Sequence, residues 1–269
     1  MTKRDLPMHI CIPDLQVKPG VPLNHCEWIG KYIAEKQPHV VVNLGDHTDM
    51  ASLSSWDKKK LDFEGRRFEG DIEASLLANE LLTTPCYEAG QWDDTDWHIT
   101  IGNHEHRIDR FVQDNPELAG FVDLDKLQYE YYYDHVHQFL VPVAIDGVTY
   151  AHYFYNPNTG RPFGGMIQTR IKQIGMSFTQ GHCQGVDYAM RTLPNGTRQH
   201  GLVAGSCYLH REKYLGPQGH DHWNGLVLKY NVVGGNYDVT FVSLDSLCRR
   251  YEDMPLAEFL RKTDRLIEV

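Results

Sequence analysis

The sequence predicts an α/β fold, a four-layer α/β/β/α sandwich in which two mixed sheets are flanked by helices. In the first half of the chain, short apolar runs alternate with helical patterns, which is typical of β-α-β units. In the second half, strand-like runs follow one another with turn signals between them. We expect the 269 residues to form a single domain over 1–269.

The amino-terminal part predicts two parallel strands joined by a helix. An apolar run at 9–12 predicts the first strand, and a second run at 40–44 predicts its neighbour. Between them, Asn24 is expected to cap a helix over 24–37 that has apolar residues at helical spacing. Each of these strands would therefore end directly before a polar segment, the first at Asp14 and the second at Asp46.

A long helical insertion is expected at 50–96. It contains a basic part that begins at Lys58 and a helix over 71–82 with one apolar face. The insertion could select substrates or simply cover the sheet, and the sequence favours neither role. Beyond it, a helical pattern over 104–126 is interrupted at Asn115 and Pro116.

The second half is rich in predicted hairpins. The Asp146-Gly147 step between two apolar runs predicts a two-residue turn. A helix over 165–174 follows, and the chain ends with a helix over 255–266. The remaining strand-like runs are 188–192, 202–204, 226–230 and 239–244.

The charge of the chain excludes some partners. The formal net charge is −10, which argues against tight non-specific binding to duplex nucleic acid, because such binding relies on Lys and Arg. It does not exclude a nuclease, because bound divalent ions would add local positive charge.

The cysteines and the apolar segments indicate the compartment. The six cysteines are scattered and form no C-x-x-C pair, and we find no signal peptide. No stretch approaches the roughly 18 apolar residues that a membrane helix requires. We therefore expect a reduced, cytoplasmic protein with no membrane partner.

Five short polar segments, each following an apolar run, carry the chemistry. Such positions, outside the carboxyl ends of strands, are where α/β folds place their active sites. The ligand types Asp, Asp, Asn, His and His recur in this order, which predicts a two-metal hydrolytic centre. The segments are Asp14-Leu15-Gln16, Gly45-Asp46-His47-Thr48-Asp49, Gly102-Asn103-His104-Glu105, Ala151-His152 and Gly181-His182-Cys183-Gln184.

This order of motifs resembles that of the calcineurin-like metallophosphoesterase superfamily, which implies the four-layer sandwich and a metal-dependent phosphoesterase. The resemblance covers residues 9–184, roughly two-thirds of the chain. Ala204-Gly205-Ser206-Cys207 resembles the glycine-serine segment that follows the last histidine motif. The stretch Trp223-Asn224-Gly225 resembles phage- and prophage-type members.

The resemblance also implies roles for individual residues. Asp46 would bridge two cations and Asp14 would ligate one of them, while a bridging hydroxide attacks the phosphate ester. His104 would not be a ligand, and would instead bind the scissile phosphate and protonate the leaving oxygen as a general acid. The ligands implied for the other cation are Asn103, His152 and His182.

The sequence departs from the usual family pattern at Gln16 and Gln184, where histidines are common. Both replaced imidazoles would belong to the same cation, whose ligands would then be the oxygens of Asp14, Gln16, Asp46 and Gln184. We expect this site to prefer a hard ion and to bind it more weakly than the neighbouring site. Of the two divalent ions, Mn²⁺ is favoured, with Mg²⁺, Fe²⁺, Ni²⁺ or Zn²⁺ as alternatives.

Three further residues are expected to support the centre. Asp49 would brace its loop by hydrogen bonds. Glu105 and Arg107 would orient His104, although an ordinary salt bridge at a helix start is an equal alternative. His47 could face the cleft or solvent.

Other candidates have weaker interpretations. Gly219-His220-Asp221-His222 matches the last histidine motif literally, but it follows Ser206 and lacks a preceding strand. We prefer His182 and expect His220 and His222 on a surface loop or at the substrate rim. We expect His98, His135 and His137 to be structural or exposed, and the aromatic run 129–133 to pack rather than to stack a base.

The predicted function is hydrolysis of a phosphate ester, with a phosphodiesterase or a nucleotide or nucleic-acid phosphatase favoured. Ser/Thr protein phosphatases of the superfamily have an Arg-Gly pair where this chain has Met50-Ala51, and an arginine where it has Ile101. A DNA-end nuclease, a protein phosphatase and a non-catalytic binding module remain as alternatives. Substrate choice is expected to lie with the insertion 50–96 and the loop 156–165.

Overall fold

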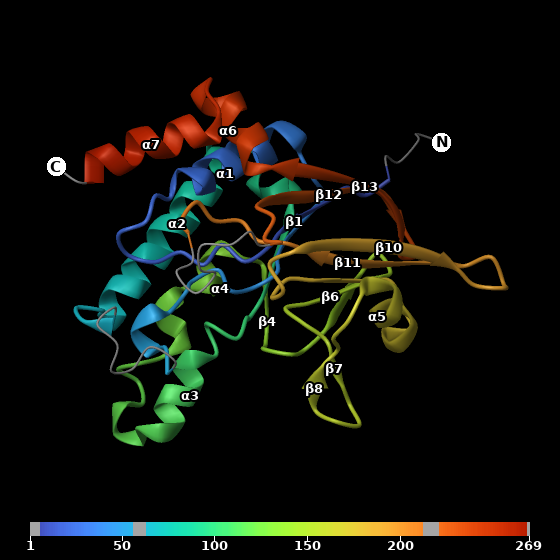
Figure 1. The fold of residues 1–269 in the computed structure, drawn as a ribbon, viewed down its shortest axis with the longest axis horizontal. Helices are drawn as coiled ribbons and strands as arrows, with labels where there is room; N and C mark the ends of the chain where they lie inside the picture. The colour runs from blue at the N-terminus through green and yellow to red at the C-terminus, as the bar shows by residue number, and fades with distance from the viewer. Residues whose placement is uncertain (1–5, 56–62, 212–220, 268–269) are drawn as a thin grey trace.

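The computed structural model describes residues 6–55, 63–211 and 221–267, and within them the fold is mixed α/β (Figure 1). Two large mixed sheets and one small hairpin contain the strands. In spatial order, the first sheet contains β13 (Asn236–Ser243), β12 (Gly225–Val233), β1 (His9–Ile12), β2 (Val40–Asn43), β3 (Asp96–Thr100) and β4 (His135–His137). The second contains β10 (Val186–Thr192), β11 (Arg198–Ala204), β9 (Phe178–Gln180), β6 (Val148–Ala151) and β5 (Val143–Ile145). The hairpin pairs β7 (Tyr155–Asn156) with β8 (Arg161–Pro162).

Parallel pairing brings the ends of the motif-bearing strands to one edge. In the first sheet, β1, β2, β3 and β4 are parallel neighbours, whereas β12 runs antiparallel to both of its neighbours, β1 and β13. In the second sheet, β6, β9 and β11 are parallel neighbours. The segments after β1, β2 and β3 therefore leave the first sheet together, and those after β6 and β9 leave the second sheet together.

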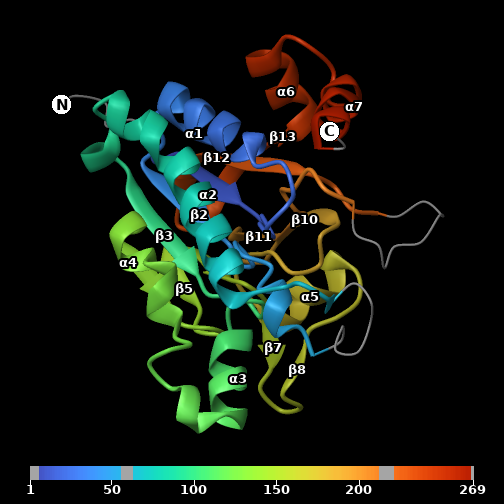
Figure 2. The same cartoon turned by 90° about the vertical axis from the view of Figure 1, so that its left-hand side faces the viewer.

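Helices pack on the outer face of the first sheet. They are α1 (Asn24–Lys36), α2 (Phe68–Glu88), α6 (Leu244–Glu252) and α7 (Leu256–Ile267). Alternation along the strands decides which residues meet them: Ile10 and Ile12 join the helix-side core, while Cys11 points to the other sheet. The helices α6 and α7 lie beside α1 in Figure 1, and Figure 2 shows α2 alongside α1.

Two smaller cores complete the packing. Val42 and Val227 of the first sheet meet Tyr150 and Leu202 of the second sheet in an apolar layer between the two. On the far face of the second sheet, α5 (Ile167–Ile174) packs against β11. Ile167 of this helix belongs to a separate apolar core with Phe178 and Val203 of the sheet.

The expected elements of the first half are present, with different boundaries. Asn24 is the first residue of α1 rather than its cap: Leu23 occupies the cap position and no side chain bonds the helix start. The helix ends at Lys36, where Gln37 adopts a left-handed conformation. The insertion helix is longer than predicted, because α2 continues through Pro85 to Glu88. The basic segment at Lys58 lies outside the described residues.

The helical pattern over 104–126 is broken into pieces. It forms α3 (Arg107–Asp114) and two 3₁₀ turns, Pro116–Leu118 and Leu124–Leu127. Further 3₁₀ turns lie at Ala51–Leu53 and Trp92–Asp94, and α4 (Tyr129–Tyr132) follows. Within the aromatic run, Tyr129, Tyr132 and Tyr133 are buried, so the prediction that this run packs is confirmed for these three residues.

The second half follows its predicted pattern closely. Asp146 and Gly147 both have positive φ, at 49° and 84°, as the tight turn between β5 and β6 requires. Helix α6 was not predicted. Among the described residues, no helix is both long enough and apolar enough to cross a membrane.

A fully buried lysine lies between the two sheets. Nζ of Lys229, on β12, donates to the hydroxyls of Tyr150 and Thr179 and lies 4.2 Å from the centre of the Tyr150 ring. Burial lowers the pKa of Lys229 to about 8, against the opposing effect of Cys11.

We expect this lysine to make the free energy of unfolding depend on pH above pH 8. Because its folded pKa lies below the unfolded value, the unfolded chain still holds the proton where the folded protein has released it. Between pH 8 and 10 the free energy of unfolding should therefore rise by roughly 1.4 kcal/mol per pH unit relative to Lys229→Met. Urea denaturation of both proteins across this range tests it, and parallel pH profiles would contradict it.

Candidate metal centre

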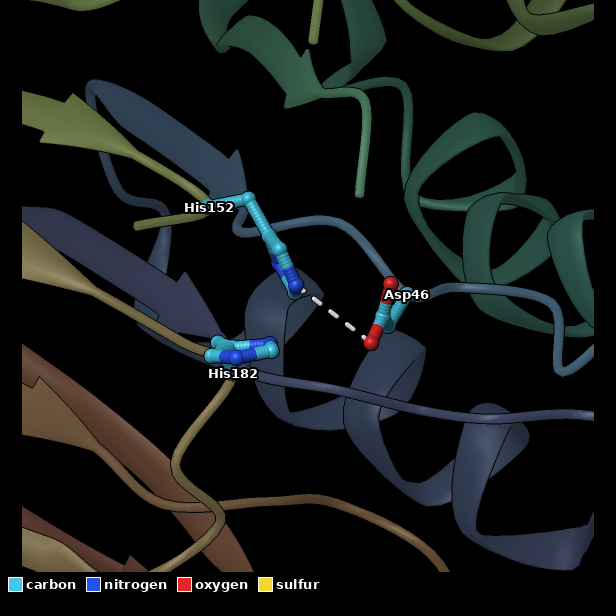
Figure 3. A group of neighbouring side chains, drawn as sticks. All are labelled: Asp46, His152 and His182. Carbon is cyan, nitrogen blue, oxygen red and sulfur yellow. Dashed lines mark ion pairs between the residues drawn. The ribbon is translucent and has the colours of Figure 1, made fainter. Parts of the chain in front are cut away.

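The five predicted segments meet at the ends of their strands. Figure 3 shows Asp46, His152 and His182 pointing toward one another from three different segments. Their ligand atoms all lie within 4.8 Å of one another. Three of the predicted ligands are therefore close enough to share one cation.

Asp46 lies at the middle of this group and is 1% exposed. Its Oδ1 accepts a hydrogen bond of 2.9 Å from the backbone N–H of His104, and its Oδ2 lies 3.3 Å from Nε2 of His152. Burial opposes ionisation, but the charges of His104 and His152 hold the pKa of Asp46 below its ordinary value. Asp46 is therefore a carboxylate, as a bridge between cations would be.

His152 is oriented with one nitrogen toward the group. Its Nδ1 donates to the carbonyl of Leu44 at 2.8 Å, which leaves Nε2 facing Asp46 and lying 3.0 Å from Oδ1 of Asn103. A backbone partner on the other nitrogen is the usual arrangement for a metal-binding histidine. Although burial disfavours the charged imidazole, Asp46 raises the pKa of His152 to about 10.

Asp14 has one carboxylate oxygen without a partner. Its Oδ1 accepts from the backbone N–H of His182 at 2.9 Å, whereas its Oδ2 is buried and has no hydrogen-bond partner among the described residues. Burial raises the pKa of Asp14 to about 7, against the opposing charge of His152. A buried oxygen of this kind is costly unless a proton or a cation satisfies it.

Four of the seven predicted ligands have left-handed backbones. The φ values of Gln16, Asp46, His182 and Gln184 are 44°, 49°, 67° and 56°. This conformation costs a non-glycine residue about 1–2 kcal/mol, and such strain concentrates at functional sites. His182 is also neutral, since burial lowers its pKa to about 4.

The glycines that precede these ligands allow the segments to approach closely. A Cβ on Gly102 would lie 2.2 Å from Oδ1 of Asp46, and one on Gly181 would lie 2.4 Å from Oδ1 of Asp14. The Gly45 position would place a Cβ 2.4 Å from the carbonyl of Thr100. No side chain fits at these three positions, which explains why the motifs that contain Asp46, Asn103 and His182 each begin with glycine.

The two glutamines are buried, and each has a hydrogen bond near the group. The backbone N–H of Gln16 donates to the carbonyl of Asp46 at 2.8 Å. Oε1 of Gln184 accepts from the hydroxyl of Tyr208 at 3.1 Å, and this hydroxyl lies 2.7 Å from Nδ1 of His222. Gly219 and His220 of the rival motif lie outside the described residues. The sequence had no signal for Tyr208. His222, which was predicted on a surface loop or at the substrate rim, lies beside Gln184 and is half-buried.

His104 lies between a carboxylate and a guanidinium. Its Nδ1 is 3.0 Å from Oδ1 of Asp49, while its Nε2 is 3.0 Å from Nη2 of Arg107 and 3.7 Å from Oδ2 of Asp46. Asp49 also pairs with Lys18 at 3.0 Å. Burial disfavours a charged imidazole, but Asp46 and Asp49 together raise the pKa of His104. Arg107 and Asp49 thus contact His104 directly.

Glu105 has a different role from the one expected. It is fully buried and does not contact the His104 ring; instead, its carboxylate accepts from the backbone N–H groups of Asp46 at 3.0 Å, Gly102 at 2.9 Å and Thr48 at 3.1 Å. The hydroxyl of Tyr129 donates a fourth bond at 3.2 Å. Glu105 therefore joins the segment after β2 to the segment after β3.

Other residues near the group are structural. His47 faces neither solvent nor cleft: it is buried, its Nδ1 lies 3.0 Å from Nδ2 of Asn43, and its Nε2 lies 3.4 Å from the carbonyl of Ser75 on α2. Cys183 is exposed and its sulfur accepts from Arg170 at 3.4 Å. A cavity of about 660 Å³ lies between α1 and α2, and none of the predicted site residues lines it.

Comparisons with known proteins add no assignment. No family model matches the sequence, and neither does any curated protein. One crystal structure aligns with 88% of this chain and 99% of its own, at 10% identity and a TM-score of 0.33. Similarity at this level carries no argument about function.

We expect Glu105→Gln to lower the free energy of unfolding. The amide would place an NH₂ group against N–H donors, so at least one buried backbone donor would lose its acceptor, at a cost of about 1–3 kcal/mol. Urea denaturation measures this loss. The matched control is Tyr129→Phe, which removes one of the four hydrogen bonds and should cost about 1 kcal/mol. Unchanged stability of the Gln variant would show that the carboxylate does not hold the two segments together.

Proposed function

We propose that this protein is a metal-dependent phosphoesterase with a binuclear centre, and that its two sheets and flanking helices are the four-layer sandwich of the calcineurin-like metallophosphoesterases. The observation that carries the proposal is the convergence of Asp46, His152 and His182 from three separate segments. The position of His104 beside Asp46 supports a catalytic role over a purely structural one.

The donor atoms suit two divalent cations. Asp14, Gln16, Asp46 and Gln184 would hold one cation through oxygen, and Asn103, His152 and His182 would complete the other with Asp46. The unpartnered Oδ2 of Asp14 and the inward-facing Nε2 of His152 favour such occupancy. When bound, two cations supply an activated water nucleophile and neutralise the charge on the phosphoryl oxygens.

His104 would act on the leaving group. Oδ1 of Asp49 lies 3.0 Å from Nδ1 of its ring, while Nε2 accepts a hydrogen bond from Nη2 of Arg107. As a general acid the imidazole would carry its transferable proton on Nε2, which requires Nη2 of Arg107 to turn from Nε2 to a phosphoryl oxygen of the ester. In the reaction this proton passes to the leaving oxygen as the phosphorus–oxygen bond breaks. Nη2 of Arg107, next to Nε2, would bind a phosphoryl oxygen and orient the ester.

The surroundings favour a diester or a nucleotide over a phosphoprotein. Met50 is fully buried and Ile101 is 1% exposed, so two positions where protein phosphatases of this superfamily have arginines are apolar and packed here. A nucleotide or nucleic-acid ester is therefore the substrate class that we propose.

Hydrolysis of bis(p-nitrophenyl) phosphate with Mn²⁺ tests the proposal. We expect turnover by the wild type and a fall in kcat of about 10²–10⁴-fold in His104→Ala, the usual contribution of a general acid. The matched control is His106→Ala, because the His106 imidazole pairs with Asp109 and stacks on Phe139 without contacting the centre.

The corresponding monoester is measured in parallel. Faster turnover of the monoester would redirect the assignment toward a phosphatase. No turnover of either ester by protein with bound metal would contradict catalysis and favour a binding protein.

The glutamines lead to a separate prediction about metal preference. We expect the cation site formed by the oxygens of Asp14, Gln16, Asp46 and Gln184 to hold Zn²⁺ weakly, because Zn²⁺ binds imidazole nitrogen more tightly than amide oxygen. The double variant Gln16→His with Gln184→His should retain one more zinc ion per chain than the wild type after dialysis. Elemental analysis counts the ions. Equal zinc retention by the two proteins would overturn the assignment of these glutamines.

A further inference from the structure

A second group of metal-binding side chains lies at the other end of β3. The parallel pairing of β3 with β4 places His98 opposite His135 and Thr100 opposite His137. Since alternate residues of a strand share a face, Asp96 and His98 lie on the same side of the sheet as one another. Three imidazoles and one carboxylate are thereby gathered at the edge of the first sheet.

The two oxygens of Asp96 each meet an imidazole. Oδ2 lies 3.0 Å from Nε2 of His98, and Oδ1 lies 3.0 Å from Nε2 of His135. One ligand atom from each of the three residues lies within 4.8 Å of the other two. Tetrahedral zinc with ligands at about 2.0–2.2 Å needs neighbouring donors roughly 3.3–3.6 Å apart. Small rotations of the exposed side chains would reach this geometry.

We propose that Asp96, His98 and His135 form a binding site for one divalent transition-metal ion, with Zn²⁺ as the best match. Two imidazoles and a carboxylate are ligands that Zn²⁺ takes, and water would complete the coordination. The side chains of Asp96 and His135 are 47% and 51% exposed, which leaves an entry path, whereas that of His98 is 7% exposed and fixed in place.

His137 is a positioning residue for this site. Its Nε2 lies 3.0 Å from Nδ1 of His98. A metal-binding histidine commonly donates its second N–H to a neighbour, which fixes the ring and directs the other nitrogen at the ion. In a metal-bound state, Nδ1 of His98 would donate to Nε2 of His137 and Nε2 of His98 would face the ion, so the observed contact fits the proposed site.

The site is separate from the candidate metal centre. His98 lies within β3, whereas Asn103 lies three residues beyond the carboxyl end of that strand, and the group formed by Asp46, His152 and His182 shares no residue with this one. The three-residue strand β4 pairs only with β3 in the described sheet, and an ion held by Asp96, His98 and His135 would clip this edge strand to its neighbour. The inference does not depend on the proposed phosphoesterase activity.

Zinc binding by matched variants tests the site. After dialysis against micromolar Zn²⁺, the wild type should retain one more zinc ion per chain than His135→Ala, while His39→Ala should match the wild type. His39 is the suitable control, because it is an exposed histidine directly before β2 and its Nδ1 accepts from the backbone of Met8. His137→Ala should keep the site but bind zinc about 10–100-fold more weakly. Equal zinc retention by the wild type and His135→Ala would overturn the proposal.

A crystal soaked in Zn²⁺ gives an independent result. We expect an anomalous-scattering peak between Asp96, His98 and His135, and none at this place in His135→Ala. Absence of the peak in the wild type would reject the site. Hydrolysis of the diester should be the same in His135→Ala and the wild type, which separates this proposal from the proposed function.

Discussion

The burial of carboxylates at the ends of β1 and β2 is the constraint on which the centre depends. Asp14 is fully buried, Asp46 is 1% exposed, and Glu105 lies fully buried beside Asp46. Removing such charges from water costs several kcal/mol each unless opposite charges or donors compensate. The group meets this demand only in part: His104 and His152 hold Asp46 ionised, while burial raises the pKa of Asp14 to about 7. Negative charge that the surrounding side chains leave uncompensated is what a cation would neutralise.

The unusual backbone of the site follows from this burial. The backbone donors that reach Asp14, Asp46 and Glu105 come from neighbouring loops, so the loops must turn sharply within a few residues of the strand ends. Left-handed residues provide these turns, and glycines such as Gly102 allow the chain to pass within van der Waals distance of a carboxylate. The strain is thus local to the residues that face the carboxylates. The packed sheets on either side hold these residues in their strained backbone conformations.

The sequence could predict those structural features that depend on residues close together along the chain. The strands of the first half, the hairpin turn at 146–147 and the position of each motif after a strand all follow from short apolar runs and the residue types that end them. Helix α6 was missed because its charged residues hide a short apolar stripe, although Ser243 accepts from the N–H of Ser246 and is a recognisable cap. The role of Glu105 was missed because its donors come from residues 46, 48 and 102, so only the fold brings them together.

The groups of side chains at the two ends of β3 differ in how well the sequence predicts them, for a physical reason. At the carboxyl end, the local backbone makes the site: a glycine, strained turns and a particular order of ligands leave a pattern that can be read along the chain. At the amino end, ordinary strand residues meet only because β3 and β4 pair in one register across 37 positions, from His98 to His135. Shifting that register by one residue would turn both histidines of β4 to the opposite face. Because pairing register is not written in local sequence, His98 and His135 look like unremarkable histidines until the sheet is known.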